Sequence, residues 1–158
     1  MTREKIQDFT LRVSNANKTE MIVILYDIAK TYIKDALEAL DNDAKASFRV
    51  EVNRVRDTIG ELICSVNTST ELGLNLLRLY IFCNGELTKA FMDYDKSPLY
   101  HVLSIINKLS EAYEELSKKD TSGPIMEHAE AVYQGFTYNR SLKQENVSGA
   151  DANRGFLV

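Results

Sequence analysis

Residues 17–40 read NKTEMIVILYDIAKTYIKDALEAL, and this stretch decides the fold class. Asn17 followed by Glu20 is a variant of the capping box, in which two side chains satisfy free backbone donors at a helix start. The helix that follows has a wide apolar face, so we expect it to contact more than one neighbouring helix. The residues of this face are Met21, Leu25, Ile28, Tyr32 and Ala36, widened by Ile22, Ala29, Ile33, Leu37 and Leu40.

Three further segments repeat the helical period. Their apolar stripes are Phe48, Val52, Val55, Ile59, Leu62 and Val66; then Leu72, Leu76, Leu79, Cys83, Leu87 and Ala90; then Leu99, Val102, Ile106, Leu109, Tyr113 and Leu116. Residues 67–70 are expected to end the second helix and to cap the third. Ser97 is expected to cap the last helix, with Pro98 at its first position. Because the connections are short, consecutive helices should run antiparallel. The sequence predicts an all-α fold, an up-down-up-down four-helix bundle over residues 17–118.

Two flanking segments differ from the bundle in texture. Residues 1–16 form an N-terminal arm or short helix, on which Ile6, Phe9 and Val13 make one apolar strip. Residues 119–158 are expected to be a linker and a flexible C-terminal tail, with one short helix from residue 125 to residue 134.

The composition narrows the function classes. Apolar residues make up 44% of the chain and charged residues 27%, which is typical of a globular protein. A net charge of -4 without a basic run disfavours nucleic-acid binding. The longest apolar stretch, residues 21–26, is too short for a membrane span, and the first nine residues lack the apolar core of a signal peptide. We therefore expect a cytoplasmic protein without membrane insertion.

Residues able to carry catalysis or bind a cofactor are scarce. Neither His101 nor His128 follows a Glu at the spacing that di-iron bundles use, and no glycine-rich phosphate-binding motif occurs. Both histidines are read as isolated surface or half-buried residues. Cys64 and Cys83 fall within apolar patterns and are expected to be reduced and buried. The sequence predicts no enzyme activity, no metal and no cofactor.

Four pieces of the sequence, in order, resemble the flagellin export chaperones of the FliS type. Residues 21–27 follow a small-Ala-small turn at residues 15–17, and residues 54–62 are similar to the family's second helix. The third helix is the closest match, and residues 111–115, EAYEE, are similar to the family's E-A-W. The matching residues of the third helix are Asn75, Leu76, Leu79, Tyr80, Phe82, Leu87 and Ala90. Ile28, Arg54-Val55 and Tyr113 depart from the family pattern.

The resemblance implies a function. Chaperones of this family are cytosolic four-helix bundles that bind the disordered C-terminal segment of flagellin, prevent its premature polymerisation and deliver it to the flagellar export apparatus. The export gate is a second partner under this reading. The candidate partner-binding residues are Phe9, Tyr26, Asp27, Arg54, Ile59, Leu62, Leu72, Asn75, Leu76, Leu79 and Tyr80.

Each candidate residue also has a purely structural interpretation that does not involve a partner. The apolar candidates also suit a plain core, and Tyr26 and Tyr80 suit either the core or a groove edge. Asp27 also suits an ion pair with a nearby base, and Asn75 suits a polar residue that fixes bundle register. A second function class, a dimerisation or regulatory module with a different protein partner, predicts a tight symmetric dimer instead of a monomer with an open apolar groove.

Overall fold

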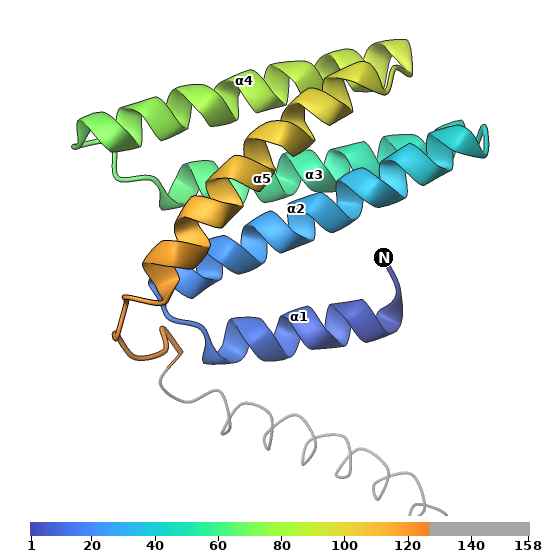
Figure 1. The fold of residues 1–158 in the computed structure, drawn as a ribbon. Coiled ribbons are helices and arrows are strands. Elements are labelled where there is room, and N and C mark those ends of the chain that lie inside the picture. The colour runs from blue at the N-terminus through green and yellow to red at the C-terminus, as the bar shows by residue number, and fades with distance from the viewer. Residues whose placement is uncertain (127–158) are drawn as a thin grey trace, which may run out of the picture. The chain divides into compact units, whose positions relative to one another are not determined.

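The computed structural model describes residues 1–126, which form five helices and no strand (Figure 1). The expected tail, His128 and nearly all of the short helix predicted from residue 125 lie outside the described residues. The long helices are α2 (Lys18–Asp41), α3 (Lys45–Ser65), α4 (Glu71–Asp93) and α5 (Ser97–Ser117). The all-α prediction is confirmed.

The four long helices pack in a ring. α2 and α4 each contact both α3 and α5, and consecutive helices reverse direction along the chain (Figure 1). Among these helices α2 is the most enclosed, since its buried residues fall on several faces rather than on one stripe. The wide apolar face of residues 17–40 is explained by this position, because α2 packs against α3, against α5 and against the N-terminal helix.

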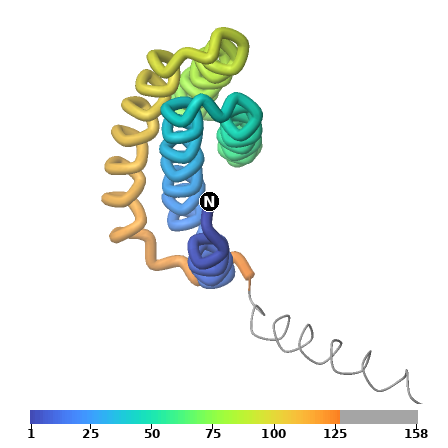
Figure 2. The backbone as a smooth tube through the Cα atoms, turned by 90° about the vertical axis from the view of Figure 1, so that its right-hand side faces the viewer, coloured from blue at the N-terminus to red at the C-terminus, as the bar shows by residue number. Residues whose placement is uncertain are grey.

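The N-terminal segment forms α1 (Arg3–Asn15), which lies against α2 on the side away from α4 (Figures 1 and 2). No residue of α1 is buried. A helix of 13 residues is marginally stable alone, so the order of α1 depends on its contacts with α2.

The helix starts follow the sequence with one exception. Asn17 accepts a hydrogen bond from Glu20 N at 2.8 Å and its own N–H donates to Glu20 Oε2 at 2.9 Å, which completes the predicted capping box. Ser97, predicted as the cap of the last helix, is instead its first residue. The residue before it, Lys96, makes no side-chain capping bond, and Asp95 Oδ1 accepts a hydrogen bond from Ser97 N at 3.0 Å.

Most of the predicted stripe residues are buried or half-buried, but Leu72, Leu79 and Leu116 are exposed. Cys64, which was expected to be buried, is exposed as well. Leu72 lies in the first turn of α4, and Leu116 and Cys64 lie in the last turns of their helices, where a neighbouring helix no longer covers the same face. Leu79 is turned to the edge of the buried face because Tyr80, beside it, takes the core position. Within residues 1–126, no helix is long and apolar enough to span a membrane.

Candidate partner-binding surface

Helix α4 leaves large apolar side chains uncovered along most of its length. One face of the helix enters the core, through Leu76, Tyr80, Cys83, Leu87 and Ala90. Other faces carry Leu72, Leu74, Leu79, Ile81, Phe82 and Met92, each exposed by more than a third of its surface. Clustered apolar exposure on one element is typical of a protein-contact surface rather than of a solvated helix.

A pocket of about 250 Å³ opens at the start of α4. The lining comes from the starts of α2 and α4, the end of α3 and one residue of α5. Its residues are Lys18, Thr19, Ile22, Ser65, Val66, Asn67, Thr70, Leu72, Gly73, Leu76, Tyr80 and Tyr113. We call this the α4 pocket. Apolar walls with a rim of hydroxyl, amide and ammonium groups suit a large apolar side chain of a partner, with its backbone at the polar rim.

The floor of the α4 pocket rests on two buried tyrosines. The hydroxyl groups of Tyr26 and Tyr80 lie 2.5 Å apart, and the ring of Tyr113 packs edge-on against Tyr26 at 5.6 Å between centroids. Burial raises the pKa of Tyr80 to about 12, and burial with the Tyr80 hydrogen bond raises the pKa of Tyr26 further. Both phenols therefore stay neutral. Tyr80 lines the pocket, whereas Tyr26 lies beneath it in the core.

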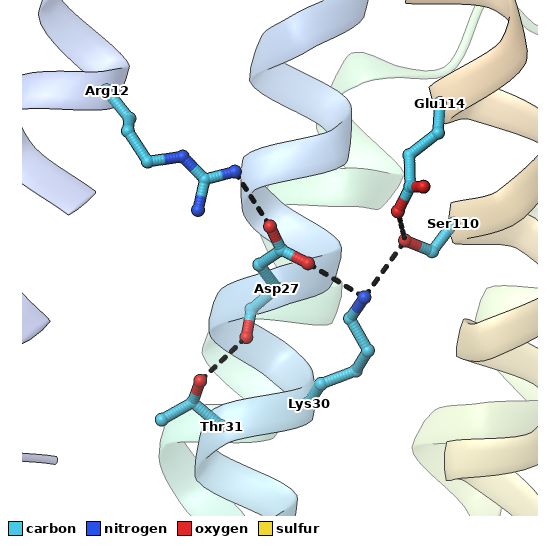
Figure 3. Close-up of polar contacts among 6 residues, drawn as sticks. All are labelled: Arg12, Asp27, Lys30, Thr31, Ser110 and Glu114. Atoms are coloured by element: carbon cyan, nitrogen blue, oxygen red, sulfur yellow. Dashed lines mark hydrogen bonds and ion pairs between the residues drawn. The ribbon is translucent and has the colours of Figure 1, made fainter. Parts of the chain in front are cut away.

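Asp27 is the centre of a polar chain that joins α1, α2 and α5 (Figure 3). Its carboxylate accepts from Arg12 of α1 and from Lys30, each at 2.7 Å, and Lys30 Nζ donates to Ser110 of α5 at 3.0 Å. Burial alone would raise the pKa of Asp27, but the hydrogen bonds from Lys30 and Arg12 outweigh it and the pKa is lowered. In this structure Asp27 serves the ion-pair role and ties α1 to the bundle.

Apolar contacts under α1 form a second surface. A pocket of about 280 Å³ lies between α1 and α2 and is lined by Met1, Ile6, Phe9, Thr10, Val13, Ile28 and Tyr32. Ile28 and Tyr32 of α2 face the predicted stripe of Ile6, Phe9 and Val13 on α1. We call these two α2 residues the α1 strip, because α1 covers them. Because a pocket remains between the two helices, α1 covers this apolar face of α2 without filling the space beside it.

The remaining candidates divide between core and surface. Ile59 and Leu62 are fully buried in α3, so they support the bundle from inside. Arg54 is exposed, where it pairs with Glu51 at 2.7 Å and lies 5.5 Å from the ring centroid of Tyr32. Asn75 is exposed on α4 and accepts a hydrogen bond from Arg78 at 3.0 Å. The structure therefore brings Leu72, Leu76 and Tyr80 together at the α4 pocket, and the other candidates elsewhere.

Several surface residues escaped the sequence analysis. Leu74, Ile81 and Met92 fall out of phase with the predicted core stripe of α4, and that misfit is the signal that could have found them. Lys18, Thr19 and Asn67 line the α4 pocket through chain reversals that no periodicity reveals. These three residues come together only because the ends of α2, α3 and α4 meet in the folded protein.

His101, Cys64 and Cys83 are the histidine and the cysteines of residues 1–126. His101 is largely exposed, as predicted, and its Nδ1 lies 2.7 Å from Glu86 Oε2, so it is a surface histidine with a carboxylate partner. Cys83 is buried as expected, and burial raises the pKa of its thiol to about 11. Among residues 1–126, no group of His, Cys, Asp and Glu is placed to hold a metal ion.

The fold and surface define a small helical bundle with uncovered apolar side chains along α4. Residues 3–120 match the family model described as flagellar protein FliS, so the chain belongs to that family. The match spans α1 to α5 and ends within the segment after α5. A comparison with curated proteins gave no match.

Proposed function

We propose that the protein is a cytosolic export chaperone that binds the disordered C-terminal segment of flagellin, keeps it from polymerising early and delivers it to the flagellar export apparatus. Membership of the FliS family makes a flagellar partner the natural client. The single observation that carries the proposal is the uncovered apolar surface of α4 with the pocket at its start.

The arrangement of the two apolar surfaces favours an extended client over a folded one. The α4 pocket is lined by the starts of α2 and α4, whereas the α1 strip faces α1. α1 lies against α2 on the side away from α4 (Figure 1). A folded partner offers one face, whereas a disordered segment can follow a curved path and contact both sides. The client would order on binding, and the entropy lost moderates affinity and favours later release.

We assign different roles to the two surfaces. The α4 pocket is open and receives an apolar side chain of the client directly, with Leu72 as its outer wall. The α1 strip is occupied by α1, so the client reaches Ile28 and Tyr32 only by displacing Phe9 and its neighbours.

A calorimetric titration tests this proposal. A peptide with the C-terminal segment of the flagellin from the same genome should bind one to one and gain helix by circular dichroism. Leu72→Asp should weaken binding roughly ten- to hundredfold, since it replaces a buried leucine contact by a charge. Asp at this position, the second residue of α4, suits a helix start, so stability should be unchanged.

Leu74→Asp separates the pocket from the rest of the apolar surface of α4. Leu74 lies in the same end of α4 and is also exposed, but it does not line the pocket, so its loss of affinity should be smaller than that of Leu72→Asp. Equal losses for the two variants would show that the pocket has no special part in binding. No heat and no helix gain at tens of micromolar peptide, where micromolar recognition is visible, would refute the proposed client.

A further inference from the structure

The segment that follows α5 turns back onto the junction between α1 and α2. It was expected to be a linker, yet the N–H of Ile125 donates to the carbonyl oxygen of Ala16 at 3.0 Å. The Thr19 hydroxyl donates to Asp120 Oδ2, and Asn17 Nδ2 lies 3.4 Å from the carbonyl oxygen of Asp120. Figure 1 shows this segment beside the end of α1 and the start of α2.

The segment has internal order of its own. Asp120 Oδ1 accepts hydrogen bonds from the N–H of Ser122 at 3.0 Å and from its hydroxyl at 2.6 Å, which forms an Asx turn. Hydrogen bonds from the Ser122 and Thr19 hydroxyls, and then from the Ser122 N–H, lower the pKa of Asp120 to about 2. Asp120 therefore keeps its charge at neutral pH. We call residues 120–125 the clasp.

The clasp meets the chain at the one place where α1 must pivot to leave α2. Only Ala16 and Asn17 separate the two helices, and both are buried. Their shared peptide group is held at both ends: Asn17 N–H donates to Glu20 and the Ala16 carbonyl accepts from Ile125. With the clasp in place, this peptide plane is fixed relative to α2, so α1 can move only through torsions before it.

Other contacts also hold the N-terminal segment on α2. Arg12 pairs with Asp27, the terminal ammonium of Met1 lies 2.6 Å from Asp35 Oδ2, and the apolar residues of α1 stay partly exposed on the α1 strip. An ion pair as exposed as Arg12–Asp27 contributes little stability by itself. The hold on the pivot therefore adds to what keeps α1 docked.

We propose that the clasp, residues 120–125, controls how readily α1 leaves α2 and so sets access to the α1 strip. Its effect on the client rests on the proposed function, whereas its effect on α1 does not. When the Asp120 and Ile125 contacts break, the Ala16–Asn17 peptide is free to rotate about the backbone bonds on either side of it. The undocked state of α1 then becomes more populated. The clasp thus couples the end of α5 to the N-terminal helix.

Hydrogen exchange of the client-free protein tests the proposal. Asp120→Ala removes the Asx turn and the Thr19 bond from an exposed segment, so the bundle should fold normally. The exchange of α1 amides should rise by roughly three- to tenfold, the effect of one or two lost hydrogen bonds. A chain ending at Lys119 should show the same rise, and a chain ending at Met126, which keeps the clasp, should match the full-length protein.

Asp95→Ala is the matched control, because Asp95 also accepts from a backbone N–H two residues on, but at the turn between α4 and α5. Unchanged α1 exchange in Asp120→Ala and in the chain ending at Lys119 would overturn the proposal. Equal loosening of α1 and of the first turns of α2 would also overturn it, since the segment would then only support the bundle end. Faster α1 exchange with unchanged peptide affinity would leave the clasp standing and refute the role of the α1 strip in client binding.

Discussion

At the residue scale, Gly73 shows how one missing side chain shapes the α4 pocket. A Cβ at Gly73 would lie 1.8 Å from the carbonyl oxygen of Asn67, which is backbone and cannot yield cheaply. The turn between α3 and α4 therefore packs against the helix only because this residue is glycine. Both Gly73 and Asn67 line the pocket.

Gly73→Ala should lower the free energy of unfolding by about 1–3 kcal/mol, because the inserted carbon forces the Asn67 backbone away. Gly60→Ala is the control, since a Cβ at Gly60 meets nothing within 4 Å and alanine favours helix by up to about 1 kcal/mol. Urea denaturation followed by circular dichroism measures both. If Gly73→Ala is as stable as Gly60→Ala, the turn does not pack as described.

The buried tyrosine pair predicts a pH dependence. Tyr80 titrates near 10 in the unfolded chain and at about 12 in the fold, and the pKa of Tyr26 is raised as well. The folded state keeps protons that the unfolded state loses. The contribution of the tyrosine pair to the free energy of unfolding is thus complete below about pH 10. It is lost as the pH rises from there through the pKa of Tyr80 in the folded protein.

Denaturation curves from pH 8 to pH 11 should show stability falling above about pH 10. The double variant Tyr26→Phe with Tyr80→Phe removes both hydroxyls together and should flatten this fall. Tyr80→Phe alone leaves the buried Tyr26 hydroxyl without its partner and should cost about 1–3 kcal/mol at neutral pH. A wild-type curve that stays flat to pH 11 would contradict the burial of the pair.

At the scale of the element, we expect α1 to act as a cover of the α1 strip. None of its residues is buried, and its apolar side chains face a partly open pocket on α2. Docking of such a helix competes with any client that uses the same strip. An occupied strip lowers apparent affinity in proportion to the fraction of molecules in which α1 is docked.

Deletion of residues 1–14 should therefore strengthen binding of the flagellin peptide, by roughly three- to tenfold if α1 is docked most of the time. The deletion leaves the Asn17 capping box intact. Arg12→Ala, which removes only the ion pair with Asp27, should shift the affinity in the same direction by less. Weaker binding after the deletion would show that α1 is part of the site.

At the scale of the whole molecule, the packing assigns the helices different tasks. α3 contributes a fully buried stripe and α2 is enclosed, whereas α4 presents apolar side chains on faces that no other helix covers. Under the proposed function, α4 is the helix that contacts the client. α1 and the clasp meet at the start of α2, where we propose that the clasp controls access to the α1 strip.

The sequence by itself determined the elements. Alternating steps of three and four residues located α3 to within two residues, and Asn17 with Glu20 marked the start of α2, because helix period and capping are local properties. The FliS-type family was also visible, since its motifs lie within single helices. Local patterns of this kind carry over directly into the structure.

The tertiary structure alone decided which apolar residues of the predicted stripes face inward. Leu72 and Leu79 continue the core stripe in sequence yet are exposed, whereas Tyr26 and Tyr80 become a buried pair across helices far apart in the chain. The contact of Ile125 with Ala16 joins residues that no local pattern links. Burial depends on where a neighbouring helix ends and on how far chain segments return, and a single sequence specifies these only through the completed fold.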